Sequence, residues 1–276
     1  LDYRNTHAME RAFEGVRFRA EPASIARLAG TFLRLKKDAK AFQPDVIIAS
    51  GDSHIGFLAR FLASSIGAKF VFDVYDYYPA FPGNRVPGMK PMFRHSVCKA
   101  HLVFCASLPL LNKLAVQNKN VVLVENGVDR NVFFPMDKRS ARVSLGLPLH
   151  IPILGYFGAI TPKRGPLLLE AAEILKPELP GLRVLMAGPM IGARPTSDVL
   201  DYRGCLPQDQ LPPLISACDV VVVPYERDPQ IDLSGACKIA EYLACERPVV
   251  ATRVSAHELL FAGVDSSLCD PVPVSL

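Results

Sequence analysis

Short apolar runs alternate with segments of helical period along nearly the whole chain, and this alternation restricts the fold more than any other feature of the sequence. A strand that reads as a continuous apolar run is buried on both faces, and such strands occur in parallel sheets whose crossover connections are helices. The sequence therefore predicts an α/β protein built from parallel sheets with crossover helices.

A first series of these segments fills the N-terminal half. Residues 23–42 have apolar side chains at helical spacing between basic ones and end before Pro44, and residues 45–50 (DVIIAS) follow as a buried strand. The same reasoning predicts helices over residues 57–66 and 109–116 and strands over residues 69–74, 102–106 and 121–124.

A second series begins after the Asn126-Gly127 turn signal and a segment, residues 131–151, that is rich in proline and charge and has no clear period. We therefore expect a domain boundary near residues 132–150. The expected strands of this series are residues 153–157, 183–187, 220–223 and 249–252, and the expected helices are residues 166–175, 208–217 and 237–244. Two doubly wound domains in tandem would face each other across a cleft, beyond the carboxyl ends of their strands.

Composition fits a globular protein with two domains, since the chain has 276 residues, half of them apolar and 21% charged. No apolar stretch approaches the roughly 18 residues that span a bilayer. The chain begins at Leu1 without a basic and apolar leader, so nothing indicates secretion. The seven cysteines show no CxxC and no zinc-ligand spacing, so we expect reduced, mostly buried thiols in a cytosolic protein.

The two halves of the chain differ in charge. Residues 1–136 hold 18 Lys and Arg against 11 Asp and Glu, a net charge of +7, whereas residues 137–276 hold 13 against 16, a net charge of −3. The basic half could face an anionic partner such as a membrane surface. Ordinary solubilisation of the surface is the alternative, because the charges are spread along the sequence.

Residues 234–252 (SGACKIAEYLACERPVVAT) read as a loop of small residues, a helix and a buried strand, the arrangement in which α/β proteins hold a phosphorylated ligand. Lys238 and Glu241 are three residues apart, so on a helix their side chains project side by side. The small residues at 234–236 would let the backbone approach a phosphate, with Lys238 as its cation and Glu241 accepting hydrogen bonds from ribose hydroxyls. An exposed ion pair between the two side chains is the alternative.

Residues 158–165 (GAITPKRG) follow an expected strand and precede an expected helix. Lys163 and Arg164 in this loop suit a diphosphate, because backbone N–H groups and a guanidinium fork both favour multidentate anions. Two anion sites in one domain fit a nucleoside diphosphate better than a metal ion, and no Asp-x-Asp run follows a strand. The absence of GxGxxG gives nicotinamide binding little support.

Polar residues also follow two expected strands of the N-terminal half. Asp52 and His54 follow one strand, and Asp73, Tyr75 and Asp76 end another, where a site is expected and a core needs no ionisable group. A histidine of this kind is often a helix cap or a surface residue, and the tyrosine could be a core aromatic side chain instead of a stacking platform for a sugar.

Taken together, five segments resemble the retaining, nucleotide-sugar-dependent glycosyltransferases of the GT-B fold (glycosyltransferase group 1, family 4-like), in the order in which that family carries them. They are VVLVENGVDRNVFFP at 121–135, ILGYFGAITPKRG at 153–165, LRVLMAGP at 182–189, YRGCLPQDQLPPLISACDVVVVPY at 202–225 and KIAEYLACERPVVAT at 238–252. The joint match covers about half of the chain.

The resemblance implies two Rossmann-like domains that face a cleft. The first, residues 1–135, would bind the acceptor and lacks its first strands; the second, residues 150–276, would bind the nucleotide sugar and lacks its closing helices, so the chain looks like a fragment truncated at both ends. The expected reaction is the metal-independent, retaining transfer of a sugar, by a hexosyltransferase-type enzyme, to a lipid-linked or polysaccharide acceptor. A nucleotide-sugar 2-epimerase and a non-catalytic nucleotide-sugar-binding protein are the alternatives.

The chain departs from the family pattern at three places. The first of the family's two glutamates falls at Leu233, with Asp232 one residue away, while Glu241 matches the second. The sequence therefore leaves open which residue binds the donor sugar. The arginine after the first glycine is replaced by Ala159. At the end of the Glu241 helix, where the family has glycine, this chain has Glu246, and we expect a left-handed backbone conformation there.

The hypothesis assigns residues to three groups. The catalytic candidates are His54, Asp76, Lys238 and Arg164. The candidates for donor-nucleotide binding are Gly158, Lys163, Arg164, Gly188, Ser234, Gly235, Ala236, Lys238 and Glu241. The acceptor-side candidates are Asp52, His54, Asp73, Tyr75 and Asp76. We expect no cofactor beyond a UDP-, GDP- or ADP-linked co-substrate, no metal ion, no nucleic-acid partner, and a cytoplasmic location, with the basic N-terminal domain at the inner face of the membrane as an option.

Overall fold

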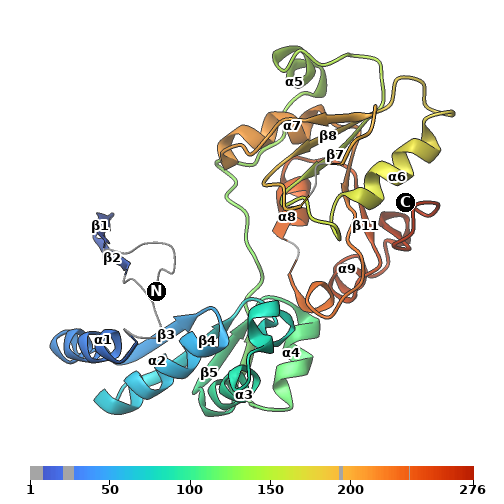
Figure 1. The fold of residues 1–276 in the computed structure, drawn as a ribbon. Coiled ribbons are helices and arrows are strands. Elements are labelled where there is room, and N and C mark those ends of the chain that lie inside the picture. The colour runs from blue at the N-terminus through green and yellow to red at the C-terminus, as the bar shows by residue number, and fades with distance from the viewer. Residues whose placement is uncertain (1–8, 21–27, 193–194, 236) are drawn as a thin grey trace. The chain divides into compact units, whose positions relative to one another are not determined.

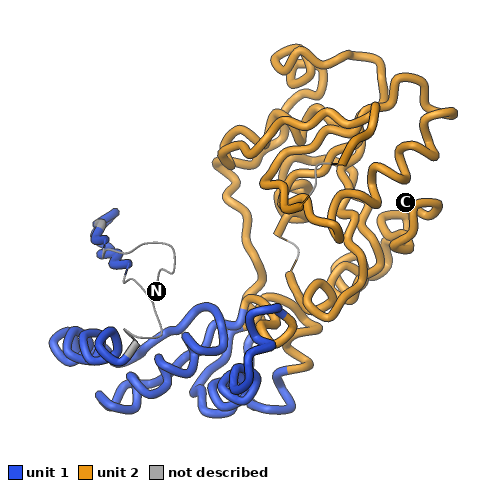
Figure 2. The backbone as a smooth tube through the Cα atoms, in the orientation of Figure 1, with its two compact units in different colours: residues 1–74, 81–104, 114–122 blue, residues 75–80, 105–113, 123–276 orange. Residues whose placement is uncertain are grey.

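The computed structural model describes residues 9–20, 28–192, 195–235 and 237–276, which form two compact units (Figure 2). Unit 1 comprises residues 1–74, 81–104 and 114–122, and unit 2 comprises residues 75–80, 105–113 and 123–276. Most of a four-stranded sheet belongs to unit 1, and a six-stranded sheet belongs to unit 2 (Figure 1). The chain is therefore an α/β protein, as its alternating pattern predicts.

The four-stranded sheet has the strand order β3-β4-β5-β6, and β3 and β4 pair in parallel. Its elements are α1 (Leu28–Phe42), β3 (Val46–Ser50), α2 (Ser53–Ile66), β4 (Lys69–Val74), α3 (Met89–Lys99), β5 (Leu102–Cys105), α4 (Leu108–Ala115) and β6 (Val121–Leu123). A separate antiparallel hairpin of β1 (Met9–Phe13) and β2 (Val16–Ala20) precedes them, and short 3-10 helices η2 (Tyr78–Ala80) and η3 (Pro82–Arg85) lie between β4 and α3. Of the helix expected over residues 23–42, residues 23–27 lie outside the described residues.

The six-stranded sheet is entirely parallel and has the order β12-β11-β10-β7-β8-β9. Its strands are β7 (Ile153–Phe157), β8 (Arg183–Ala187), β9 (Leu200–Tyr202), β10 (Val220–Val223), β11 (Val249–Thr252) and β12 (Leu268–Cys269). Its helices are α5 (Lys138–Ser144), α6 (Pro166–Leu175), α7 (Leu211–Ala217), α8 (Cys237–Ala244) and α9 (Ser255–Leu260), with 3-10 turns η4 (Gln208–Gln210), η5 (Ile231–Leu233) and η6 (Asp265–Ser267). The first strand in the sequence, β7, lies at the centre of the sheet. Strands β8 and β9 then extend the sheet on one side, and β10, β11 and β12 extend it on the other, which is the doubly wound order.

The core of unit 2 is built from the faces of this sheet and the helices that cover it. The strand residues of β7, β8, β10 and β11 are mostly buried, as continuous apolar runs require. Tyr242 of α8 is fully buried, and its hydroxyl accepts a hydrogen bond of 2.8 Å from the backbone N–H of Phe157. This bond satisfies a polar group that would otherwise be buried alone, and it fastens α8 to the end of β7.

The helix α5 lies within the segment where the sequence shows no periodicity. Its Arg142 is buried and donates hydrogen bonds to Asp219 (2.7 Å) and to backbone carbonyls that include those of Ala217 and Leu149 (2.9 Å each). Because the helix is fixed by a buried guanidinium and its acceptors, a search for apolar spacing does not detect it.

Two expectations from composition have different outcomes. No helix of the described residues is both long and apolar enough to cross a bilayer. The seven cysteines are free thiols, but three of them are buried and three are exposed, so the expectation that most are buried is wrong. The exposed ones, Cys98, Cys205 and Cys237, lie on helix ends or loops where no apolar layer covers them.

Glu246 ends α8 in the left-handed region, with a φ of 53°, as the sequence predicts. The backbone N–H of Glu246 donates to the carbonyl of Leu243 (2.9 Å), and that of Arg247 donates to the carbonyl of Tyr242 (3.2 Å). This pair of bonds is the Schellman arrangement, in which glycine is the usual residue at the left-handed position.

We expect Glu246→Gly to raise the free energy of unfolding by up to about 1 kcal/mol, because glycine adopts this conformation without the steric cost of a Cβ. Urea denaturation measures the change. As a matched control, Glu170→Gly on the exposed side of α6 is expected to lower stability by about 1 kcal/mol. Unchanged or lower stability of Glu246→Gly would contradict the helix end described here.

Candidate functional site

The strand order of unit 2 reverses between β7 and β10, and this switch point locates the candidate site. All strands of the sheet run in the same direction, so the loops that follow β7, β8, β10 and β11 leave from one edge. Ligands of doubly wound sheets bind at this edge, beside the switch point. Gly158 follows β7 and Gly188 follows β8, so both glycines stand at this edge.

Gly158 and Gly188 are in close backbone contact. A Cβ on Gly188 would collide with the carbonyl oxygen of Gly158 and lie 3.0 Å from its Cα, and the φ of Gly188 is 139°. A Cβ on Gly158 would lie 2.7 Å from Nζ of Lys238 and overlap the end of that side chain. Gly158 therefore makes room for Lys238, which extends from α8 over the end of β7, and Gly188 makes room for the backbone of Gly158. The hydroxyl of Tyr202 donates to the carbonyl of Gly188 (2.8 Å) and holds the loop in place.

Glu241 lies one turn after Lys238 on α8, as the spacing predicts. Both residues belong to the described part of the chain, and no ion pair joins them, so the simple surface ion pair is not what the structure contains. The Glu241 carboxylate accepts a 3.3 Å hydrogen bond from Gln208 of η4. Partial burial raises the pKa of Glu241, and the charge of Lys238 and the bond from Gln208 offset part of that rise.

The two cations of the loop after β7 have different surroundings. Arg164 forms a backbone bridge with Tyr225, and its guanidinium carbon lies 4.7 Å from the centroid of the Tyr225 ring. Lys163 instead places its Nζ 2.6 Å from the carboxylate of Asp228. Arg164 is thus oriented by an aromatic face and keeps its hydrogen-bond donors for other partners, whereas the charge of Lys163 is already paired.

The loop before α8 packs closely against other segments of unit 2. Ser234 Oγ lies 2.5 Å from Oδ1 of Asp76, and the carbonyl of Leu233 accepts a 2.7 Å hydrogen bond from Ser107. A Cβ on Gly235 would lie 2.7 Å from the carbonyl oxygen of Ala106. Close packing against Ala106 therefore requires a glycine at position 235. The sequence instead predicts a small residue there so that a phosphate can approach the backbone. Ala236 lies outside the described residues.

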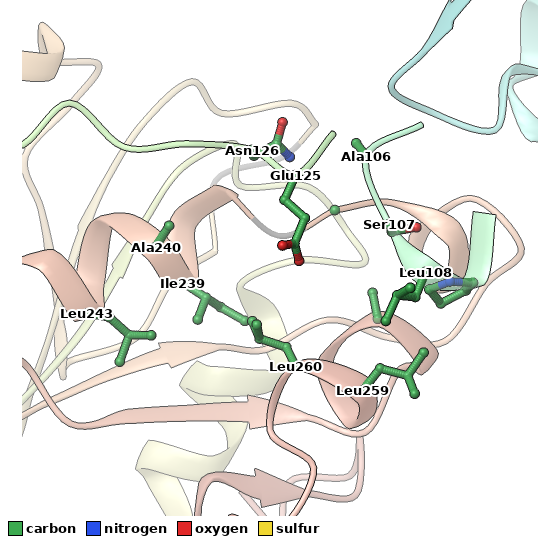
Figure 3. Close-up of a pocket in the computed structure, with 13 residues that line it drawn as sticks. Ala106, Ser107, Leu108, Glu125, Asn126, Ile239, Ala240, Leu243, Leu259 and Leu260 are labelled. Carbon is green, nitrogen blue, oxygen red and sulfur yellow. The ribbon is translucent and has the colours of Figure 1, made fainter. Parts of the chain in front are cut away.

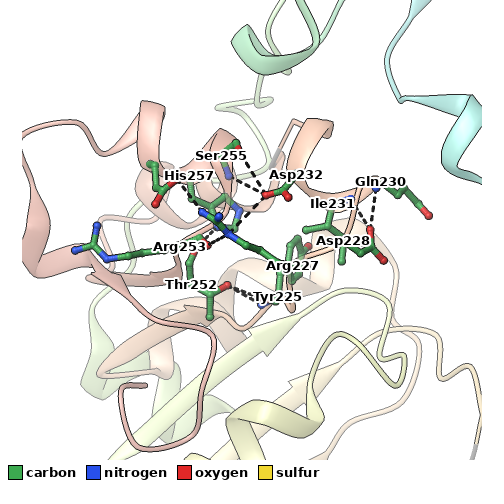
Figure 4. A network of polar contacts seen from close by, with 11 residues as sticks. Tyr225, Arg227, Asp228, Gln230, Ile231, Asp232, Thr252, Arg253, Ser255 and His257 are labelled. Atoms are coloured by element: carbon green, nitrogen blue, oxygen red, sulfur yellow. Dashed lines mark hydrogen bonds and ion pairs between the residues drawn. The ribbon is translucent and has the colours of Figure 1, made fainter. Parts of the chain in front are cut away.

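Two carboxylates that sequence reasoning did not assign hold the loop after β10 (Figure 4). Asp228 accepts hydrogen bonds from the backbone N–H groups of Gln230 (2.8 Å) and Ile231 (2.9 Å), at the start of η5. Asp232 accepts a hydrogen bond of 3.1 Å from the N–H of Ser255, at the start of α9. Asp228 follows shortly after a strand end, the same signal that singled out Asp52, so it could have been found from the sequence.

A second layer of contacts supports the same loop (Figure 4). Arg227 donates to the carbonyl of Arg253 (2.9 Å), and the buried ring of His257 packs against Tyr225 with 5.6 Å between centroids. Burial lowers the pKa of His257 to about 4, so the ring is neutral near pH 7 and its Nδ1–H donates to the carbonyl of Thr252 (2.8 Å). This histidine is structural.

The acceptor-side candidates fall into both units. In unit 1, Asp52 is the N-cap of α2 and accepts hydrogen bonds from the N–H of Ser53 (2.5 Å) and from Asn84 (2.8 Å). Asp73 accepts a 2.6 Å bond from Ser50, and His54, in the first turn of α2, has a pKa that burial lowers. Asp52 and Asp73 therefore each have a structural role.

In unit 2, Tyr75 is 47% exposed and packs edge-on against Tyr78, with 5.5 Å between ring centroids. Asp76 is half-buried and reaches the loop before α8 through Ser234. Of the five acceptor-side candidates, Asp76 is the one that the structure connects with a donor-side candidate.

A cavity of about 340 Å³ lies in unit 2 beside Gly235 (Figure 3). Its apolar lining comes from α8 and α9 and includes Ile239, Leu243 and Leu259, and its polar lining includes Glu125. Gly235, one of the donor-nucleotide candidates, also lines this cavity, so the cavity reaches the loop before α8.

Comparisons with known proteins bear on the family and the fold of the chain. The family model described as "Glycosyl transferases group 1" matches residues 151–274. The D-inositol 3-phosphate glycosyltransferase of Mycolicibacterium smegmatis is 34% identical over 164 residues, which make up 54% of this chain and 36% of that relative.

Solved structures show the same architecture over most of the chain. The Anabaena protein HepE, solved in complex with UDP and glucose, has a TM-score of 0.72 at 19% identity, covering 92% of this chain and 71% of that one. Sucrose-phosphate synthase from Thermosynechococcus elongatus has a TM-score of 0.63 at 18% identity, covering 98% and 74%. These likenesses show that the chain has the GT-B fold with Rossmann-like domains.

The sequence match is more specific than the fold. It shows a group 1 glycosyltransferase domain over residues 151–274, which lie within unit 2. The chain spans 36% of the length of the mycobacterial relative.

The two glycines at the strand ends should respond differently to alanine. We expect Gly188→Ala to lower the free energy of unfolding by at least about 2 kcal/mol, because its Cβ meets rigid backbone. Gly158→Ala should cost less, because the atoms it meets belong to the flexible end of Lys238. Gly127→Ala, whose Cβ has open space, is the control and should be nearly neutral. Equal losses for Gly158 and Gly188 in urea melts would contradict the described contact.

Proposed function

We propose that the protein is a retaining glycosyltransferase that transfers a sugar from a nucleotide sugar to a hydroxyl of a lipid-linked or polysaccharide acceptor. The observation that supports this most is the position of Lys238 over Gly158, with Glu241 on the same face of α8, inside a group 1 glycosyltransferase domain. In this proposal the nucleoside diphosphate lies at the switch point, against the backbone of Gly158 and Gly188.

Each polar group of the site has a role in this proposal. Lys238, Arg164 and the N-terminus of α8 after Ser234 stabilise the charge that develops on the diphosphate leaving group, an electrostatic effect worth several kcal/mol in enzymes. Glu241 accepts hydrogen bonds from the ribose hydroxyls. Lys163 acts through Asp228, by tying the loop after β7 to the loop after β10.

The acceptor side and the location of the protein complete the proposal. Asp76, in unit 2, and His54, in unit 1, are the proposed catalytic groups, and the resemblance implies that no metal ion takes part. The net charge of +7 in residues 1–136 supports an acceptor at an anionic membrane surface, met from the cytoplasmic side.

A thermal-shift panel with UDP, GDP and ADP tests nucleotide binding. A nucleotide present at 100 times its dissociation constant should stabilise the protein by about 2.7 kcal/mol. We expect one of the three to raise the melting midpoint. If none of them does, the assignment of the donor site is wrong.

Glu241→Ala tests the site within that panel. The variant should lose the shift, because the ribose hydroxyls lose their acceptor. Glu170→Ala on the exposed side of α6 is the matched control and should keep the shift. A full shift in Glu241→Ala would contradict the ribose role.

Product analysis then separates the reactions. Incubation with the nucleotide sugar and a glycan or lipid-linked acceptor should give a glycosylated acceptor with the anomeric configuration of the donor. A free epimer would indicate a 2-epimerase instead, and binding without turnover would indicate a non-catalytic protein.

A further inference from the structure

Asp76 is a half-buried carboxyl group at the edge of the candidate donor site. It follows β4 along the chain and belongs to unit 2, where its Oδ1 lies 2.5 Å from Oγ of Ser234. Within the described residues, no ammonium or guanidinium group lies at ion-pair distance from Asp76. Arg164, from the loop after β7, is the charged group that acts on it, and does so from beyond ion-pair contact.

The protons around Ser234 can be counted. Its hydroxyl lies 2.5 Å from Asp76 and 2.7 Å from the backbone carbonyl of Gln230. A hydroxyl carries one proton, and a carbonyl oxygen can only accept. If Ser234 donates to Gln230, a hydrogen bond with Asp76 requires a proton on the carboxyl group. Both contacts are satisfied together when Asp76 is a carboxylic acid that donates to Ser234.

The surroundings of Asp76 favour the same state. Partial burial raises the pKa of Asp76, and this rise is offset only in part by the charge of Arg164 and by the hydrogen bond that the Ser234 hydroxyl would donate to an ionised carboxylate. A nucleoside diphosphate bound at the switch point would bring negative charge toward this group and would draw on the same Arg164. A neighbouring like charge disfavours an ionised carboxylate further.

We propose that nucleotide binding is linked to protonation of Asp76, so that this carboxyl group is neutral when the diphosphate is bound. The inference rests on the proposed function, since it needs a nucleotide at this site. The sign of the linkage follows directly. Above the pKa of Asp76 in the free protein, binding takes up a proton, and affinity falls as pH rises by up to about tenfold per pH unit.

Asp76→Asn isolates this group from the other titratable residue of the site. Glu241 also has a pKa raised by burial, so a pH dependence of the wild type alone would not identify its source. An asparagine has nearly the shape of the protonated acid, and its Nδ2–H can donate to Ser234 as the proposal requires of Asp76. The variant therefore fixes the neutral state while leaving Glu241 intact, and a thermal melt checks that it folds.

The experiment measures the dissociation constant of UDP-glucose, or of GDP- or ADP-glucose if the panel selects that base, by calorimetry from pH 5 to 8. These donors have no phosphate group that titrates in this interval. We expect the affinity of the wild type to fall with pH, and calorimetry in buffers of different ionisation enthalpy to show proton uptake. Asp76→Asn should lose the slope and bind at least about tenfold more tightly than the wild type at pH 8. Asp198→Asn, whose side chain is 94% exposed, is the matched control and should keep the slope.

The outcomes separate the two proposals. Binding with no pH slope and no proton uptake in the wild type would overturn the linkage while leaving the proposed function in place. A wild-type slope retained in Asp76→Asn would assign the proton to Glu241 and also overturn it. No binding of any of the three donors at pH 5.5 would overturn the proposed function, and the linkage with it.

Discussion

The close approach of Gly158 and Gly188 is the contact on which the candidate site depends. At the ends of β7 and β8 the two backbones leave no room for a Cβ on Gly188 and none on Gly158 beside Lys238. The lysine can therefore extend over the strand end, while the N–H groups of Gly158 and Gly188 donate to the carbonyls of Ala187 and Gly204 (2.8 Å each). A cation beside a glycine-rich edge at the switch point of a doubly wound sheet is the arrangement on which the proposed anion site rests.

The carboxylates around this edge divide into those that hold the protein together and those that remain for a ligand. Asp228 and Asp232 accept backbone N–H groups at the starts of η5 and α9, so they fix the loop that leads to α8. Glu241 and Asp76 have no such backbone partner in the described structure, and burial raises the pKa of both. Carboxyl groups with few hydrogen-bond donors or cations to stabilise their negative charge have raised pKa values, and such groups cluster at functional sites.

Four of the six strands of the parallel sheet were predictable because buried parallel strands and their helices carry strong local signals, whereas the short strands β9 and β12 and helix α9 were not predicted. The strands 153–157, 183–187, 220–223 and 249–252 and the helices 166–175 and 237–244 have the expected bounds. The helix expected from residue 208 begins as a 3-10 turn, with α7 starting at Leu211 beside two prolines that lack an N–H. Helix α5 was missed because a buried arginine fixes it, and α3 was not predicted; its sequence, with Pro91 inside, has a weak apolar period.

The residue types of the site were predictable, but their partners were not, because partners come from distant segments. Sequence spacing predicts Lys238 beside Glu241, yet only the fold reveals that Lys163 pairs with Asp228 and Arg164 stacks on Tyr225. A pairing across 65 residues has no local signature.

The replacement of the family's first glutamate by Leu233 has a structural consequence. Its neighbour Asp232 cannot take over that role without giving up its hydrogen bonds to Ser255, which begin α9. Leu233 itself contributes its carbonyl to Ser107. A carboxyl group from the segment after β4, that of Asp76, is bonded to this loop through Ser234. This loop therefore carries a leucine at the position where the resemblance implies a glutamate, and it contacts an acid from the segment after β4, whose charge state matters for the proposed donor site.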